Sequence, residues 1–533
     1  MAEITQLQRD GLYELTDSAK AQLADSKYYN EDLAPSTMAE RTWNTYHISM
    51  LWVGMAICIP SIMMASGGVA LGLPVWASVL NVILGNAIIL VPIQLNSHAG
   101  TKYGIPFPIF SRLTFGMRGA HIPSISRAVT ACGWNMVQSM VGGGALTMII
   151  KALVPAFNDQ PVGIQFLFFL IFMALCAWIT ATGSKAIRIF ESFSSPVLII
   201  LIVLLLVWSV VLANGAGFSF GQVFSSDLSA GGLTETYQYV FAFLVVLTGN
   251  IAFWATMALN IPDFSRWAKN QKTQFRGQMY GMVPAMAFCA IVGAFMAQAT
   301  FLALDEAIFD PVGVLGHLGV GTGAVVLTVV VGIGVIFATM TTNIAANIVA
   351  PANGFSNLAP GKIGYKAGVL IACIVSIVAY GIPFYFVGGA FIGFMFNFLN
   401  TYGAFLAPLA SIFILDYYFI KKKNIDIISL YQANSRYWYK SGFNTHAIIA
   451  WVAGAILPTI LGLIPAISAT VGEPALVSQI GGLAVFAWIN ANAYLFSFFV
   501  AFLVYWKIAP REGVHILSDE QEKAITQEVA ATA

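Results

Sequence analysis

Apolar runs about as long as a bilayer is thick recur along the whole chain, and they constrain its fold more than any other feature. A helix needs about 20 apolar residues to cross the hydrocarbon core of a membrane. Only 9% of the 533 residues are charged, against about 25% in soluble domains. The sequence therefore predicts an all-α polytopic membrane protein with twelve transmembrane helices. They are expected at residues 46–67, 75–98, 123–150, 161–182, 185–213, 236–259, 277–303, 321–351, 364–386, 388–415, 444–469 and 480–507.

Basic side chains predict the orientation of the chain, because Lys and Arg are enriched in cytoplasmic loops. With the amino terminus inside the cell, nearly all of these residues fall in inner loops, and Lys151 is the one assigned outside. We therefore expect a protein of the cytoplasmic (inner) membrane with both termini in the cytoplasm. Its expected parts are an N-terminal tail (1–45), a membrane core of ten helices (46–415), a cytoplasmic loop (416–443), helices eleven and twelve (444–507) and a C-terminal tail (508–533).

Two of the expected membrane helices are interrupted. The run 46–67 contains Gly54 and Pro60, and the run 236–259 carries Gly249 and Asn250 near its middle. These runs hold corresponding positions if the first ten helices form two halves of five. A matched pair of this kind is typical of a transporter site built on inverted repeats, since unwound backbone at that depth must line a cavity. The alternative is that Gly and Pro are simply common in membrane helices.

Two tryptophans and two amides indicate a binding chamber inside the membrane. Trp134 and Gln138 are four residues apart and share one helix face, and Trp254 ends the interrupted stretch of the sixth run. A flat heterocycle could stack between two indoles. Gln138 and Asn347 would offer it both donors and acceptors. The alternative is that tryptophans anchor helices at the membrane interface and that amides join helices.

Hydroxyl and carbonyl oxygens indicate a cation site. Thr341 and Thr342 lie in the eighth run, and carbonyls of Gly54, Ile57 and Ala338 could add further oxygens. Hard cations favour oxygen ligands, so a sodium ion could bind there without a formal negative charge. The alternative is that each threonine bonds its own helix at position i−4.

Acidic side chains are expected only near the ends of the membrane helices. Glu191 and Asp263 lie near cytoplasmic ends of their runs, which argues against a carboxylate proton relay but leaves proton coupling open. The chain also has neither an HExxH motif nor a carboxylate pair at depth, so we do not expect an enzyme. No resident cofactor is expected.

An ordered set of motifs runs along most of the chain. The motifs are Asn30–Pro35, Glu40–Trp43, Leu51–Ala56, Gly100–Pro108, Phe115–Gly119, Cys132–Trp134, Phe253–Ala255, Asn260–Phe264 and Thr342–Asn347. As a set they resemble the nucleobase:cation symporter-1 family. The resemblance implies the leucine-transporter-like fold, with two inverted five-helix repeats plus two further helices. It also implies import of a planar nitrogen heterocycle (a nucleobase such as uracil, cytosine or a purine, or allantoin or a hydantoin), coupled to a cation by alternating access.

The resemblance also implies roles for single residues. Trp134 and Trp254 match the indoles that stack on the two faces of the substrate, with Gln138 and Asn347 as its polar partners. The oxygens named above match the sodium ligands: Gly54, Ile57, Ala338, Thr341 and Thr342.

Four further positions border the implied pocket. Cys58 stands where a carboxamide can occur, and Phe253 stands where a small residue can occur, so the identity of the substrate stays open. Phe398 and Leu399 lie on a helix that would close over the substrate as a gate.

The sequence leaves the coupling ion open between sodium, which we favour, and protons. The expected partners are a small heterocycle and membrane lipid, without nucleic acid, and a monomer is the working expectation. A channel or a substrate sensor that uses the same pocket is the alternative function.

Overall fold

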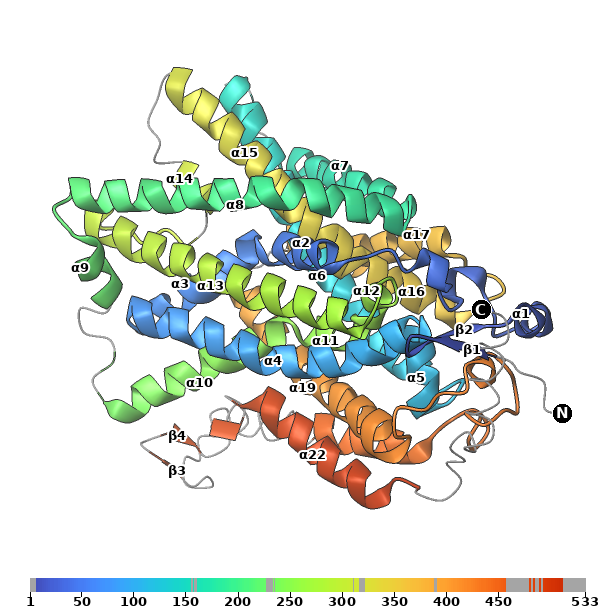
Figure 1. The fold of residues 1–533 in the computed structure, drawn as a ribbon. Helices are drawn as coiled ribbons and strands as arrows, with labels where there is room; N and C mark the ends of the chain where they lie inside the picture. Colours follow the sequence, from blue (N-terminus) through green and yellow to red (C-terminus); the bar gives the residue numbers. More distant parts are fainter. Residues whose placement is uncertain are drawn as a thin grey trace.

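The structure is a computed structural model that describes residues 6–510, apart from 155–156, 158–160, 227–232, 234, 310, 316–321, 388–390, 457–478, 481–482, 485–487 and 490–491. Long helices dominate it, and α4, α8 and α13 run side by side across the view of Figure 1. The helices of the first half are α2 (Thr45–Ala56), α3 (Ile59–Ala70), α4 (Val75–Tyr103), α5 (Phe107–Phe115), α6 (His121–Leu153), α7 (Val162–Ala181), α8 (Ser184–Gly215) and α9 (Phe220–Ser225).

The second half continues with a similar series of helices and ends in a C-terminal group. Its members are α10 (Thr236–Phe253), α11 (Ala255–Asn260), α12 (Pro262–Ser265), α13 (Gln271–Leu304), α14 (Pro311–Leu315), α15 (Thr322–Thr342), α16 (Val349–Leu358), α17 (Tyr365–Val375), α18 (Ile382–Val387) and α19 (Phe391–Ile414). Three π-helical stretches interrupt this series, η4 (Asn343–Ile348), η5 (Ser376–Gly381) and η6 (Leu415–Ile420). The C-terminal group holds the short turn η7 (Ile428–Leu430), the two-residue strands β3 (Gln479–Ile480) and β4 (Leu483–Ala484), and α22 (Ala493–Ile508).

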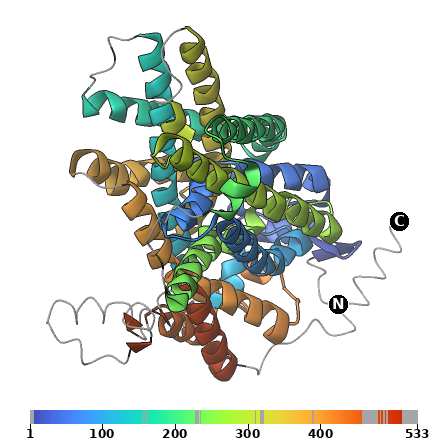
Figure 2. The ribbon, with the colours of Figure 1, turned by 90° about the vertical axis from the view of Figure 1, so that its left-hand side faces the viewer.

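Nine helices in the described part of the chain are long and apolar enough to cross a membrane, and the bent pair α2 and α3 makes a tenth span. Where the eleventh and twelfth spans are expected, the described residues form shorter apolar helices at Thr445–Ile456 and Ala493–Ile508. Residues 457–478 lie outside the described residues, so the count of twelve stays a prediction. Figures 1 and 2 both place α22 beside α19, the helix against which it packs.

The expected interruption of the first span is confirmed, and the proline explains it. Helices α2 and α3 meet at an angle of 56°, with Ile57 and Cys58 outside helical geometry between them. Pro60 occupies the first turn of α3, where a missing backbone N–H breaks no helical hydrogen bond. The break therefore falls just before the proline.

The expected interruption of the sixth span is present, but it lies at Trp254, the end of the predicted stretch, and not at Gly249 and Asn250. Gly249 and Asn250 lie inside α10, and the backbone leaves helical geometry only at Trp254 (φ −102°, ψ 8°). The Asn250 amide donates to the Val246 carbonyl one turn earlier and to Asn81 Oδ1 on α4, both at 3.0 Å. Asn250 thus joins α10 to α4 and stabilises the helix at this point.

The N-terminal segment folds into a small cap instead of a free tail. Strands β1 (Gln6–Arg9) and β2 (Leu12–Leu15) form an antiparallel hairpin whose two turn residues both have positive φ, as the tight primed hairpin turns require. Helix α1 (Asp17–Leu23) and the short turns η1 (Glu31–Leu33) and η2 (Met38–Glu40) follow.

Buried hydrogen bonds hold this cap against the membrane core. The Arg41 guanidinium donates to the Thr101 carbonyl at the end of α4 at 3.0 Å and to two carbonyls of the cap itself. Burial lowers the pKa of Arg41 to about 10. Asn30 also donates to the carbonyl of Ile363 between α16 and α17 at 3.2 Å, so the cap contacts both halves of the core.

Small residues allow the central helices to pack closely. Helix α13 lies against α2, α3, α4 and α8. A side chain at Gly293 of α13 would collide with the backbone carbonyl of Ile62 on α3, and one at Gly281 would come within 2.6 Å of the Ser49 carbonyl on α2. Close approach through small residues is the usual way that membrane helices associate. These contacts fix α2 and α3, and thereby the Gly54 carbonyl on α2 and the Ile57 carbonyl between the two helices.

Candidate functional site

An aromatic cluster lies where α6, α10 and α19 meet. The ring of Trp134 on α6 meets the ring of Phe253 edge to face, with centroids 5.3 Å apart and planes at 76°. Its indole N–H donates to the hydroxyl of Tyr402 on α19 at 3.2 Å. The Tyr402 hydroxyl donates in turn to the Ala252 carbonyl of α10 at 3.0 Å. These two bonds fix the plane of the Trp134 indole relative to α10.

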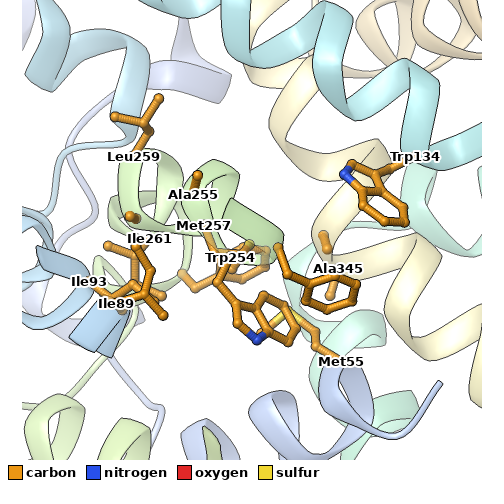
Figure 3. Packing of buried hydrophobic residues seen from close by; sticks show 14 of the residues in the cluster. Met55, Ile89, Ile93, Trp134, Trp254, Ala255, Met257, Leu259, Ile261 and Ala345 are labelled. Atoms are coloured by element: carbon orange, nitrogen blue, oxygen red, sulfur yellow. The ribbon is translucent and has the colours of Figure 1, made fainter. Parts of the chain in front are cut away.

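The two predicted indoles do not face each other across an open gap. The Phe253 ring contacts Trp254 at 5.0 Å with planes at 90°, while it also contacts Trp134. Trp254 packs on its other side against Trp52 of α2, at 5.2 Å. Figure 3 shows Trp134 and Trp254 well apart, with Ala345 between them in that view. Because a phenyl ring stands where a small residue was the alternative, the space between the indoles is filled in this structure.

The polar residues around Trp134 are buried and partly unpaired. Gln138 is buried one turn beyond Trp134, and its Oε1 has no hydrogen-bond partner among the described residues. Asn347 donates to Asn343 Oδ1 at 3.2 Å, and Asn343 donates to Asn135 Oδ1 on α6 at 2.8 Å. Gln138 therefore offers a free acceptor, whereas Asn347 is part of a chain of amides.

Sequence reasoning missed three members of this site. Asn135 and Asn343 connect the amide chain to α6, and Tyr402 bonds Trp134. Two of them carried a usable signal, since Asn343 lies four residues before Asn347 on one helix face and Asn135 is adjacent to Trp134. Tyr402 had none, because its partners lie on other helices.

A π-helical segment carries the amides of the eighth span. Residues Asn343–Ile348 form η4 directly after α15. Segments of this type are rare and occur often at functional sites. Thr341 and Thr342, which face α2, end α15 directly before this segment, and Asn343, whose amide reaches α6, begins it. One span thus presents hydroxyls to one neighbour and amides to another.

The structure brings together four of the five predicted cation ligands. Thr341 Oγ1 donates to the Gly54 carbonyl at 2.8 Å, and Thr342 Oγ1 lies 3.2 Å from the same oxygen. Both hydroxyls also reach the Ala338 carbonyl of their own helix, at 2.9 and 3.2 Å. The own-helix alternative and the cross-helix contact therefore coexist. Thr342 further lies 3.0 Å from the Met55 carbonyl, an oxygen that sequence reasoning did not consider.

This oxygen set fits a sodium ion chemically. Each hydroxyl has the Ala338 carbonyl as a second acceptor, so its proton can turn there while its lone pairs turn toward an ion. The fifth predicted ligand, Ile57, lies outside the hydrogen bonds that the two threonine hydroxyls make among the described residues, but it lines the same cavity as Ala338. That cavity measures about 160 Å³ and is apolar.

Cys58 lies in this apolar cavity rather than in the aromatic cluster. It is buried, with its Sγ 3.2 Å from Ser61 Oγ, and it lines the cavity together with Ile57 and Ala338. The cavity runs between α3, α8, α14 and α15. A role of Cys58 in substrate binding stays a prediction.

The predicted gate residues lie on α19, the helix that contributes Tyr402 to the aromatic cluster. The ring of Phe398 meets Trp134 at 6.0 Å and Tyr402 at 5.0 Å. Leu399 is fully buried. Phe398 thus contacts the indole that it is predicted to cover, while Leu399 packs in the core.

The Asn260–Phe264 motif follows Trp254 and α11 in the chain and includes most of α12. Arg127 of α6 donates to Asn260 Oδ1 at 2.9 Å and to the Ala346 carbonyl of η4 at 2.7 Å. The Asp263 carboxylate accepts from the backbone N–H of Phe107 at 3.0 Å. Burial raises the pKa of Asp263 to about 6, and this N–H partly offsets that rise. The motif therefore ties α6, α5 and η4 together.

Comparison with known proteins gives consistent matches along nearly the whole chain. Residues 35–479 match the family model described as permeases for cytosine/purines, uracil, thiamine and allantoin. The chain is 36% identical to the purine-uracil permease NCS1 of Arabidopsis thaliana, covering 92% of this chain and 79% of the relative. It is 31% identical to the allantoin permease of Bacillus subtilis, covering 84% of this chain and 90% of the relative.

Solved structures share the fold. Mhp1, a nucleobase-cation-symport-1 family transporter in a closed conformation with bromovinylhydantoin bound, superposes with a TM-score of 0.73 at 23% identity, covering 93% of this chain and 100% of Mhp1. The inward-facing conformation of Mhp1 gives a TM-score of 0.70 at 21% identity, covering 94% and 98%. The predicted fold class of helical membrane transporters is thereby confirmed.

Proposed function

Because the chain belongs to the family of permeases for cytosine/purines, uracil, thiamine and allantoin, which are transporters and not enzymes, we propose that it is a symporter for one planar, uncharged nitrogen heterocycle. The proposed substrate is a nucleobase, allantoin or a hydantoin, imported across the cytoplasmic membrane by alternating access. The proposed coupling ion is sodium, with protons as the alternative.

The observation that carries this proposal is the fixed indole of Trp134 beside the free acceptor of Gln138. Two hydrogen bonds through Tyr402 hold the indole in place, and an aromatic contact to a guest contributes about 0.5–1.5 kcal/mol beyond burial. Gln138 Oε1 lies on the same helix face without a partner among the described residues, so it can accept from a ring N–H. In this proposal the Phe253 ring turns aside to admit the guest between itself and Trp134.

Cation coupling would act through the contact between α2 and α15. A bound sodium ion would supply the positive charge that holds the Gly54 carbonyl and the two threonine hydroxyls together. The amide segment η4 follows α15 directly, so the position of Thr342 affects that of Asn343 and of the heterocycle site. Ion and heterocycle are then linked, because both favour the same arrangement of α15 and η4.

A binding screen tests this function. The purified chain is heated with uracil, cytosine, thymine, adenine, guanine, hypoxanthine, allantoin or benzyl-hydantoin, with and without sodium. We expect at least one compound to raise the unfolding temperature of the wild type, and Trp134→Ala to remove that rise. Trp178→Ala is the matched control, because Trp178 is 69% exposed on α7. A compound that stabilises the Trp134→Ala variant as well as the wild type would contradict the proposed site.

The channel or sensor alternative makes a different prediction for flux. A symporter accumulates the substrate, and its rate saturates with substrate concentration. A channel would give a flux that rises with substrate concentration without saturation, and the inside concentration would never exceed the outside concentration. A sensor would give no flux. Uptake into vesicles therefore separates the three functions.

A further inference from the structure

One carboxyl group lies much deeper between the helices than its place in the sequence indicates. Glu191 was expected near a cytoplasmic helix end, yet it is 1% exposed and faces α2. A side chain at Gly54 would overlap Glu191 Oε2 and come within 2.9 Å of Ser195 Oγ. Because only a glycine leaves this room, the carboxyl lies directly against the residue whose carbonyl both threonines contact.

Glu191 has no partner in the described part of the chain. Neither of its carboxyl oxygens accepts or donates a hydrogen bond, and none of the ion pairs within 4.0 Å in the described residues includes it. Ser195, whose hydroxyl lies beside the same face of Gly54, donates to the Met50 carbonyl instead. A buried carboxyl without partners is costly inside a membrane and marks a functional site by default.

Among the described residues no basic side chain pairs with Glu191 to balance its charge, and Arg188, one turn earlier on α8, donates to the Thr42 hydroxyl at 2.8 Å. Helix α8 packs against α2, α13 and α15, and Phe190 stacks on Phe337 of α15 with centroids 6.2 Å apart. Nearby α15 offers only hydroxyls and carbonyls, at Ala338, Thr341 and Thr342. These oxygens carry no formal charge, so an ion among them would bring one positive charge into a medium of low dielectric.

We infer that Glu191 is the anionic side chain of the cation site, an inference that rests on the cation coupling proposed above. Each charge compensates the other, because the cost of burying either one alone falls when the two lie close together. Helix α8 then becomes the third helix that responds to the ion, beside α2 and α15. The carboxylate would also make the site bind a small cation in preference to a neutral water molecule.

Sodium titration of the unfolding temperature tests this role in the purified full chain. We expect sodium to stabilise the wild type, and Glu191→Gln to raise the sodium concentration for half of the effect at least tenfold. In choline alone Glu191→Gln should unfold at a higher temperature than the wild type, because it no longer buries an unpaired carboxylate. Glu191→Asp keeps the charge and should restore part of the sodium affinity. The control Glu235→Gln removes an exposed carboxylate at the start of α10 and should behave as the wild type.

Two outcomes would overturn the inference in different ways. If Glu191→Gln kept the wild-type sodium midpoint while Thr342→Ala lost it, the cation site would stand and Glu191 would have no part in it. If the wild type itself gave no response to sodium, the proposed coupling ion would be wrong and the role of Glu191 would fall with it.

Chemical labelling of the wild type tests whether Glu191 belongs to the cation site, and it does not depend on the folding of a variant. Dicyclohexylcarbodiimide modifies carboxyl groups in apolar surroundings, and peptide mass spectrometry locates the product. We expect sodium to slow the modification of Glu191 relative to choline. Equal rates in the two salts would contradict the inference.

Discussion

At the residue scale, the site depends on how one indole is held. Trp134 is fixed by Tyr402 and not by its own helix, since the Tyr402 hydroxyl accepts from the indole N–H and donates to the Ala252 carbonyl. Phe253 then contacts the indole edge to face. A guest that enters between these rings meets an indole whose plane is already set, so little orientational entropy is lost on binding.

Removing the Tyr402 hydroxyl should therefore weaken binding without unfolding the protein. Tyr402→Phe leaves the ring in place but frees the indole N–H and the Ala252 carbonyl. A typical hydrogen bond contributes about 1 kcal/mol, or roughly a fivefold change in affinity. We expect the KM for heterocycle uptake to rise by about that factor, with expression unchanged.

Tyr46→Phe provides the matched control, since the Tyr46 hydroxyl donates to the Ser192 carbonyl at an exposed position at the start of α2. Its KM should equal that of the wild type. An unchanged KM in Tyr402→Phe would show that the indole needs no such support.

At the element scale, the sequence predicted where helices are interrupted better than it predicted which helices pack against one another. Pro60 correctly indicated the break between α2 and α3, because a proline fits the first turn of a helix without the loss of a hydrogen bond. Proline alone does not decide a break, since Pro92 and Pro284 lie inside the continuous helices α4 and α13. Gly249 and Asn250 do not interrupt their helix as predicted, since Asn250 joins α10 to α4. Thr341 and Thr342 were correctly placed against Gly54.

The positions of Tyr402 and Glu191 were hidden for one reason. Each side chain lies against other helices, and spacing along one helix carries no information about which helix lies opposite. Glu191 was further hidden by its position near the start of α8, because the length of its side chain and the missing side chain of Gly54 decide how deep its carboxyl reaches.

Close packing of α6 on α7 gives a prediction with a neighbouring control. A side chain at Gly143 would come within 2.7 Å of the Phe169 backbone nitrogen on α7, whereas one at Gly144 would meet nothing within 4 Å. We expect Gly143→Ala to destabilise by about 1–3 kcal/mol through overpacking. Gly144→Ala should be neutral or gain up to about 1 kcal/mol of helix propensity.

The unfolding temperature in one detergent measures both glycine variants. Equal unfolding temperatures for Gly143→Ala and Gly144→Ala would mean that α6 and α7 do not approach as closely as the structure has them.

At the scale of the whole molecule, two sites share one span. The α2–α15 contact with Glu191 beside it lies on one side of the eighth span, and the amides of η4 that reach α6 lie on the other. The N-terminal cap contacts both halves of the core at the basic end. In the proposed mechanism a shift of α15 would therefore be transmitted to the proposed heterocycle site, which is what coupled transport requires.

The most direct test of this account is the dissociation constant of the heterocycle found in the screen, measured by calorimetry with and without sodium. Sodium should lower that constant in the wild type by about 5–150-fold, the usual range for coupled sites, and Thr342→Ala should abolish the effect. Thr147→Ala should keep it, because among the described residues the Thr147 hydroxyl bonds the Gly143 carbonyl of its own helix and no other group. The same dissociation constant in sodium and in choline for the wild type would contradict the account.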